Sequence, residues 1–160
     1  MQGTQIGNGI LAGLVATIVL SILMLLKSAM GMMPQLNAIE MLTQMSAHYA
    51  GLPRSPVIGW IMHFFIGTIL WGILFALTVP ALRGAFWLRG VWFSIGAWLL
   101  MMILPLPMAG AGFFGLNLGI GAPIATLVLH IIFGIVLGGT YGSLDQKRRE
   151  HHGETAQRTR

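Results

Sequence analysis

Residues 90–144 read GVWFSIGAWLLMMILPLPMAGAGFFGLNLGIGAPIATLVLHIIFGIVLGGTYGSL and contain no Lys, Arg, Asp or Glu. A helix needs about 20 mostly apolar residues to cross a bilayer, so this stretch is too long for one span and long enough for two. Pro105, Pro107 and the glycine-rich segment 109–122 divide it, because proline removes a backbone donor and glycine permits turns. The stretch therefore predicts two transmembrane helices joined by an apolar loop.

The composition of the whole chain points to the same class. Of its 160 residues, 56% are hydrophobic and 8% are charged, against about 25% charged in ordinary soluble domains. That balance excludes a solvated globular domain and a disordered chain, and the absence of cysteine excludes disulfides and thiolate metal sites. Backbone groups at membrane depth must be paired inside the protein, which favours helices. We expect an all-α integral membrane protein.

Four stretches are apolar and long enough to span the bilayer, and they predict a four-helix bundle over residues 1–144. They cover approximately residues 9–29, 57–77, 90–106 and 123–141. Between the first two, residues 37–48 place apolar side chains at partial helical spacing. This spacing predicts a short helix lying on the outer interface.

The cations are distributed unevenly along the chain. Seven of the nine Lys and Arg residues lie either at Arg83 and Arg89, between the second and third spans, or in the tail 145–160. Lys27 and Arg54 lie on the other side. Cytoplasmic loops collect Lys and Arg, so we expect a bacterial inner-membrane protein with both termini cytoplasmic. The basic tail would contact anionic lipid headgroups, and without aromatic residues it does not suggest nucleic-acid binding.

The chain aligns with itself at an offset of 67 residues. The offset superimposes four pairs of identical residues, which are Pro56 and Pro123, His63 and His130, Gly67 and Gly134, and Gly72 and Gly139. The match predicts an internal duplication, with repeat one at about 9–79 and repeat two at about 90–143. Each repeat holds two spans, so the repeats run in the same direction and an axis along the membrane normal relates them.

Four segments carry a resemblance to a known group of proteins. They are HFFIG at 63–67, WLRGVWFSIG at 87–96, PMAG at 107–110 and TLVLH at 126–130. In these segments the chain resembles small bacterial inner-membrane proteins of unknown function, the YagU-like group. The resemblance implies a four-span fold in a bacterial membrane, and it supplies no catalytic residues.

His63 and His130 are the sharpest candidates for a site. Each lies seven residues beyond the proline that opens its span, so both would sit about 10 Å below the outer end of their helices. An ionisable residue inside a membrane is a functional candidate by default. Two facing imidazoles could ligate the iron of haem b from both sides, with Gly67 and Gly134 making room for the macrocycle.

Other roles for the two histidines stay open. A neutral imidazole can simply hydrogen-bond to a neighbouring helix, and glycines let helix backbones approach one another, so a structural role fits the pattern at least as well. Hydrogen bonding to a quinone and proton transfer are further uses. Copper is another, because thioethers with imidazole suit Cu(I), although methionine is also an adaptable packing residue. Nine methionines fall toward the outer half: Met30, Met32, Met33, Met41, Met45, Met62, Met101, Met102 and Met108.

The inventory argues against an enzyme. The four acids, Glu40, Asp145, Glu150 and Glu154, lie outside the spans, which excludes paired-carboxylate catalysis. The serines of the spans occur at no motif spacing, and no nucleotide or metalloprotease fingerprint is present.

We expect a non-enzymatic accessory or assembly subunit of a larger inner-membrane complex. It would contact lipid, other membrane subunits or a second copy through its glycine-lined helices and the 109–122 loop. A haem or quinone redox protein is the alternative, then a Cu(I) protein, and a small transporter is weaker still.

Overall fold

The computed structural model describes residues 2–158, with side chains described from residue 5 to residue 150, and every regular element in that range is helical. The elements are α1 (Gln2–Ala29), α2 (Ala38–Ala50), α3 (Pro56–Phe64), the π-helix η1 (Phe65–Leu70), α4 (Trp71–Thr78), α5 (Phe86–Ile103), α6 (Pro105–Met108), the 3₁₀-helix η2 (Phe113–Leu118) and α7 (Gly121–Arg158). The all-α prediction is confirmed.

Four helical stretches are long and apolar enough to cross a membrane, and each contains one of the predicted spans. They are Gln5–Ala29, Pro56–Thr78, Phe86–Met108 and Gly121–Glu150. The second stretch comprises α3, η1 and α4, and the third comprises α5 and α6. The chain is therefore a multi-pass helical protein whose apolar surface suits a lipid bilayer.

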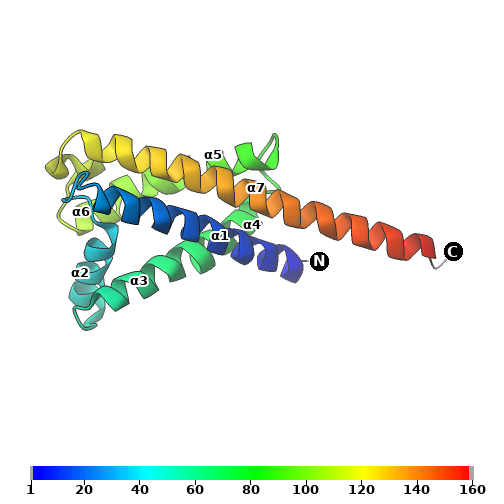
Figure 1. The fold of residues 1–160 in the computed structure, drawn as a ribbon, viewed down its shortest axis with the longest axis horizontal. Coiled ribbons are helices and arrows are strands. Elements are labelled where there is room, and N and C mark those ends of the chain that lie inside the picture. The colour runs from blue at the N-terminus through cyan, green and yellow to red at the C-terminus, as the bar shows by residue number, and fades with distance from the viewer. Residues whose placement is uncertain (1, 159–160) are drawn as a thin grey trace.

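The spans run alternately up and down along the long axis of the molecule (Figure 1). α1 packs against η1 and α4 on one side and against α7 on the other, and α7 packs against α5. Between the second and third spans, Phe93 meets Trp71 and Phe75, with ring centroids 5.8 and 5.3 Å apart. The packing order is thus two, one, four, three.

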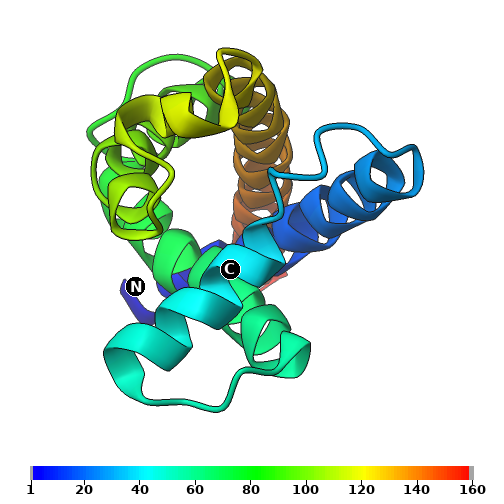
Figure 2. The same ribbon diagram turned by 90° about the vertical axis from the view of Figure 1, so that its left-hand side faces the viewer.

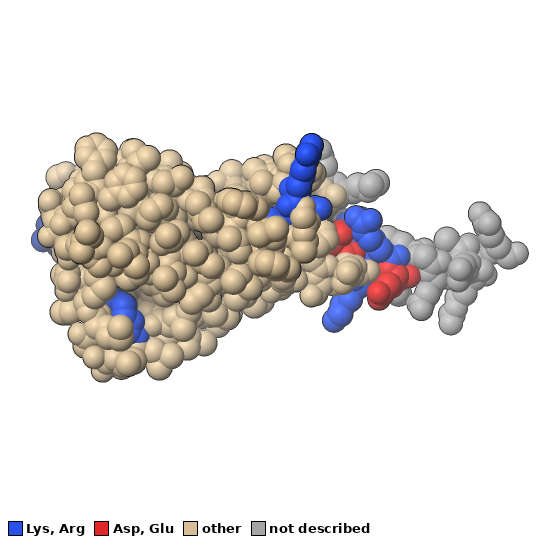
Figure 3. Space-filling model, turned by 90° about the horizontal axis from the view of Figure 1, so that it is seen from above, with Lys and Arg blue, Asp and Glu red and all other residues tan. Residues whose placement is uncertain are grey.

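The two ends of the bundle differ in composition. The loop end carries residues 30–55 and 104–120, and α2 lies across it, as Figure 2 shows in a view onto that end. The cationic end carries residues 79–89 and the start of the tail, where most Lys and Arg side chains gather (Figure 3). The charge asymmetry of the sequence therefore corresponds to a spatial separation.

Local signals explain where the elements at the loop end begin and end. Asn37 caps α2, because its side-chain oxygen accepts from the Glu40 N–H at 3.2 Å, and Gly51 ends the helix in the left-handed conformation with φ of 64°. Ser55 caps α3 in the same way, with Pro56 in the first turn. The helix predicted at residues 37–48 is confirmed within two residues at each end.

Glycines allow the paired spans to approach to backbone contact. Between the first and second spans, a Cβ atom on Gly9 or Gly13 would overlap backbone atoms at Gly72 or Thr68. Between the third and fourth spans, a Cβ atom on Gly90 would overlap the carbonyl of Gly134. Small residues bring membrane helices together in this way because lipid provides no hydrophobic force between them. These glycines therefore serve packing within the chain.

The two pairs of spans share one packing pattern. Thr17 fills the space beside Gly67 in the first pair, and Ser94 fills the space beside Gly134 in the second. The hydroxyl of Thr17 donates to the Gly13 carbonyl at 2.7 Å, and that of Ser94 donates to the Val91 carbonyl at 3.0 Å. Each pair thus places a hydroxyl side chain beside a glycine, and the internal duplication stays a prediction.

The π-helix shifts this correspondence by one residue. Gly72 packs on Gly9 in the first pair, whereas Gly138 packs on Phe86 in the second. The sequence alignment instead placed Gly72 on Gly139, a glycine whose Cβ would meet nothing within 4 Å. A π-turn adds one residue to a helix, so positions after η1 match partners one residue earlier than the alignment implies.

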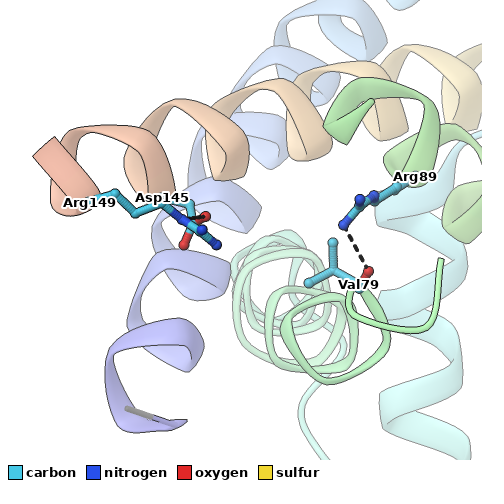
Figure 4. A network of polar contacts seen from close by, with 4 residues as sticks. All are labelled: Val79, Arg89, Asp145 and Arg149. Atoms are coloured by element: carbon cyan, nitrogen blue, oxygen red, sulfur yellow. Dashed lines mark hydrogen bonds and ion pairs between the residues drawn. The ribbon is translucent and has the colours of Figure 1, made fainter. Parts of the chain in front are cut away.

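α7 continues past the predicted boundary at residue 145 without a break. Asp145 is 9% exposed, and its carboxylate accepts from Arg149 Nε at 2.9 Å (Figure 4). Arg89 donates to two backbone carbonyls: that of Val79, directly after α4, at 3.4 Å, and that of Gly84, in the following loop, at 2.7 Å. The expected lipid contacts of the tail beyond residue 150 fall on side chains outside the described residues.

Candidate functional site

His63 lies between the first two spans in a hydrogen bond with Ser21. Its Nε2 is 3.0 Å from Ser21 Oγ, and the two residues are 8% and 7% exposed. The Ser21 hydroxyl donates its single proton to the Thr17 carbonyl at 2.7 Å. With the Ser21 proton in that bond, the imidazole donates its Nε2–H to Ser21, which leaves Nδ1 as the acceptor nitrogen.

The surroundings of His63 combine aromatic rings with an irregular backbone. Trp60 and Phe64 each present their rings to the imidazole edge-on, with centroids 5.7 Å away. The π-helix η1 begins two residues later. Within residues 5–150, only Asn8 Nδ2 and Thr68 Oγ1 are buried side-chain atoms without a hydrogen-bond partner, and Thr68 belongs to η1. Single π-turns occur frequently at functional sites, and here one lies beside a buried imidazole and contains a buried hydroxyl without a partner.

His130 has a different hydrogen bond. Its Nδ1 is 2.8 Å from the carbonyl oxygen of Thr126 on its own helix, so Nδ1 carries the proton and Nε2 keeps a free lone pair. The hydroxyl of Thr126 donates to the Ala122 carbonyl at 2.8 Å and accepts from Trp98 Nε1 at 3.1 Å. That last bond joins α5 to α7 one turn from the half-buried imidazole.

The two histidines thus have separate partners and opposite tautomers. α3 and α7 diverge toward the loop end in Figure 1, and among the hydrogen bonds of the described side chains none joins the two rings. Ligation of one iron from both sides needs the ring nitrogens about 4 Å apart. For that, His63 would have to leave Ser21 or coordinate through Nδ1. The paired haem site stays a prediction.

Gly67 and Gly134 were predicted to make room for a cofactor. In the structure the hydroxyl groups of Thr17 and Ser94 occupy the space beside them. Both glycines therefore contribute to close helix packing next to the histidine positions. Across residues 5–150, no group of three or more His, Asp or Glu residues is arranged to hold a metal ion.

Sequence reasoning missed Ser21 as a partner of His63. The signal was a stripe at four-residue spacing, Gly13, Thr17 and Ser21, which marks one face of α1. Among the hydrogen bonds of the described side chains, none links His63 to an acidic group, the third partner that orients the histidine of an activated serine. The pair is arranged to hold two spans together.

Polar side chains also tie the loop end together. Lys27 Nζ donates to the Met33 carbonyl at 3.1 Å and to the Leu36 carbonyl at 2.5 Å, which turns the loop after α1 back over the end of its helix. Met33 itself has a φ of 47°, an uncommon conformation for a residue with a side chain. Gln35 Nε2 donates to the Leu118 carbonyl at 3.3 Å and so connects the two loop regions.

The 109–122 loop has a buried side and an exposed side. Ala111 is 4% exposed and packs with Met102 and Leu106, and Asn117 Nδ2 donates to the Gly110 carbonyl at 3.1 Å. Three large apolar residues of the loop, Phe113, Leu116 and Ile120, are 65%, 57% and 79% exposed, and we call them the apolar loop face. Only part of this loop is therefore covered by the bundle.

A comparison with known protein families shows which family the chain belongs to. A model of a family of unknown function, DUF6789, matches residues 3–152. The chain belongs to this family. No curated protein and no solved structure gave a match. For a DUF6789 protein, functional arguments must therefore rest on its own residues.

The methionines of this DUF6789 protein divide between packing and exposure. Met102 is fully buried beside Leu106, and Met41 and Met101 pack against the same cluster. Met30 and Met32 are 71% and 51% exposed. Three methionines thus fill the irregular junction of α2, α5 and α6, the use to which flexible thioethers are suited.

Proposed function

We propose that this DUF6789 protein is a non-enzymatic accessory or assembly subunit of a larger complex in a bacterial inner membrane. The observation that carries the proposal is the apolar loop face, Phe113, Leu116 and Ile120, which projects from the loop end and is not covered by the bundle. Large exposed apolar groups that lie together mark interaction sites. The partner would be another membrane protein with an apolar surface at the same level.

The loop is held in one conformation, which favours docking. Gly110, Gly112, Gly115 and Gly119 have positive φ angles, and Phe114 joins them at 56°. The Asn117 side chain and backbone both bond back to the start of the loop, at Gly110 and Ala111. A surface fixed before binding loses less conformational entropy on binding, so a rigid apolar face is suited to a stable interface.

The polar groups of the membrane region support a structural role. His63 and Ser21 bond to each other, and Lys27 bonds to loop carbonyls. Each of these interactions joins two segments of the fold. Polar groups used in this way stabilise the fold, which is consistent with a scaffolding protein.

Gentle solubilisation of the native protein, followed by cross-linking and identification of co-purifying chains, tests the proposal. We expect a defined partner chain whose recovery falls at least tenfold in the double variant Phe113→Ser, Ile120→Ser. The matched control is Val57→Ser, because Val57 is 64% exposed at the same end of the molecule. A native protein that runs as a monomer without any co-purifying chain would sink the proposal.

A redox or cofactor-binding protein is the second candidate, and the His130 geometry favours it. An imidazole whose Nδ1–H donates to a backbone carbonyl presents Nε2 as a metal ligand or as an acceptor for a quinol hydroxyl. An optical spectrum of the purified protein tests haem. A Soret band that is lost in His130→Ala would support haem, and its absence would remove haem. Copper content after Cu(I) exposure, compared between wild type and Met32→Leu with Met33→Leu, tests the copper variant.

The orientation in the membrane and kinship with the YagU-like group are part of the same proposal. The chain has no cysteine, so single introduced cysteines report topology without a background signal. With both termini cytoplasmic, Gln146→Cys should resist a membrane-impermeant maleimide in intact cells, and Arg54→Cys should react. The reverse labelling pattern would overturn the orientation.

A further inference from the structure

A shallow apolar groove separates the second span from the third. It has a volume of about 290 Å³ and lies between α4 and α5. Its lining includes Trp71, Leu82, Trp92, Phe93, Gly96 and Leu100. Trp92 and Leu100 are 57% and 50% exposed, so the groove opens sideways into the surroundings of the bundle.

The shared packing pattern explains why this side of the bundle is open. On the closed side, Ala12 and Ala16 of α1 belong to the same core cluster as Phe133 and Leu137 of α7. Thr17 of α1 and Ser94 of α5 occupy equivalent positions in the two pairs of spans. The residues that precede them are therefore also equivalent, and they are Ala16 in α1 and Phe93 in α5. Phe93 meets Trp71 edge-on at 5.8 Å, and two large rings hold the third span away from the second. The groove therefore follows from a large side chain at position 93, where the equivalent residue of α1 is alanine.

The lining of the groove is mainly hydrocarbon and carries no charged side chain. The hydroxyl of Thr78 in the lining donates to the Leu74 carbonyl of its own helix at 2.8 Å. A Cβ atom added to Gly96 would meet nothing within 4 Å, so open space lies directly over that glycine. The groove lies between two spans and opens sideways, so in a bilayer it faces the lipid chains. An acyl chain is the occupant that this position and the apolar lining favour.

The cationic end of the groove indicates which lipid. Leu82 lines the groove, and the next residue, Arg83, is exposed at that end. Arg89 is already engaged with the Gly84 and Val79 carbonyls and lies 4.9 Å above the centre of the Phe86 ring. Basic groups between membrane helices near the surface recognise anionic headgroups. Arg83 is placed to contact a phosphate whose chain enters the groove.

We propose that the groove binds one chain of an anionic phospholipid and that Arg83 pairs with its phosphate. The lipid fills the open side of the bundle between Trp71 and Phe93 and holds the second and third spans at a fixed separation. This site lies on α4 and α5, away from the apolar loop face.

Native mass spectrometry of the full chain in mild detergent, titrated with dioleoyl phosphatidylglycerol or dioleoyl phosphatidylcholine, tests the proposal. We expect one retained phosphatidylglycerol per chain, bound at least fivefold more tightly than phosphatidylcholine, as one cation near a membrane surface would produce. Gly96→Phe fills the groove and should weaken binding of both lipids about tenfold, equivalent to losing contact with roughly two methylene groups. Gly139→Phe is the control, because Gly139 also faces open space but lies on α7.

Arg83→Gln tests the contribution of the lipid headgroup separately from that of the acyl chain. It should abolish the preference for phosphatidylglycerol while leaving phosphatidylcholine binding unchanged, and Arg54→Gln at the loop end should do neither. Circular dichroism and elution volume establish that each variant is folded, and Gly96→Leu replaces Gly96→Phe if the larger ring disturbs the helix. Equal retention of both lipids by the wild type, or equal losses in the Gly96 and Gly139 variants, would overturn the proposal.

Discussion

Ser21 on α1 and His63 on α3 lie 42 positions apart in the chain and share a buried 3.0 Å hydrogen bond between the first two spans. The bond extends a short chain of hydrogen bonds, because the Ser21 hydroxyl also donates a hydrogen bond to the Thr17 carbonyl. One turn further along the same interface, Gly67 backs onto Thr17. The polar contact and the close glycine contact thus belong to the same face of α1, and together they set the register of the first helix pair.

Removing the hydroxyl of Ser21 should destabilise this pair. In Ser21→Ala the Nε2–H of His63 loses its acceptor in a buried position, and we expect the free energy of unfolding to fall by about 1 kcal/mol. Unfolding by dodecyl sulfate, followed by circular dichroism, measures the change. In Ser143→Ala an exposed hydroxyl that bonds only to its own helix is removed, so this control should change stability little. Equal losses in the two variants would contradict the role assigned to the pair.

The glycine contacts predict opposite results for one substitution at two sites on α5. Gly90→Ala would place a methyl group against the Gly134 carbonyl, and we expect a loss of about 1–3 kcal/mol from overpacking. Gly96→Ala faces open space, and there alanine should stabilise the helix by up to about 1 kcal/mol. The same unfolding assay compares them. A milder effect at Gly90 than at Gly96 would be incompatible with the packing described.

The architecture could be predicted because it rests on local signals. The charge-free stretch 90–144, its two prolines and the asymmetric cations each act within one segment, so they indicate four spans without reference to the rest of the chain. The helix after Asn37 was equally accessible, since a cap and an apolar spacing define it. These features follow from lipid thickness and backbone hydrogen bonding alone.

The site contacts could not be predicted, because they depend on how the helices pack. The identity of the His63 partner depends on the register of α1 against α3, which contacts far apart in the sequence set. Beyond Leu70, a π-turn shifts the register of every following residue. The alignment of Gly72 with Gly139 failed for the same reason. Which residues of the 109–122 loop are exposed also depends on the folded structure, since composition cannot tell which side of a loop faces the bundle.

The ammonium of Lys27 should determine the order of the loop that follows α1. It donates to the carbonyls of Met33 and Leu36, so Lys27→Met removes both contacts while keeping most of the apolar stem. We expect faster hydrogen exchange across residues 30–37, by about fivefold, with little change inside the spans. Arg54→Met is the comparison at the same end. Unchanged exchange in Lys27→Met would show that the loop is held by other contacts.

The two histidines should display opposite tautomers in the folded protein. His63 gives its Nε2–H to Ser21, and His130 gives its Nδ1–H to the Thr126 carbonyl, so their protonated nitrogens differ although their sequence positions match. Nitrogen-15 NMR of histidine-labelled protein, assigned with His63→Gln and His130→Gln, distinguishes the two forms directly. Ser21→Ala should alter only the His63 signal. If both histidines were protonated at Nδ1, the Ser21 hydroxyl would have to donate to His63 Nε2 instead of to the Thr17 carbonyl. A ligand on His130 Nε2 would instead shift that resonance alone, because Nε2 is the nitrogen that the fold leaves unprotonated.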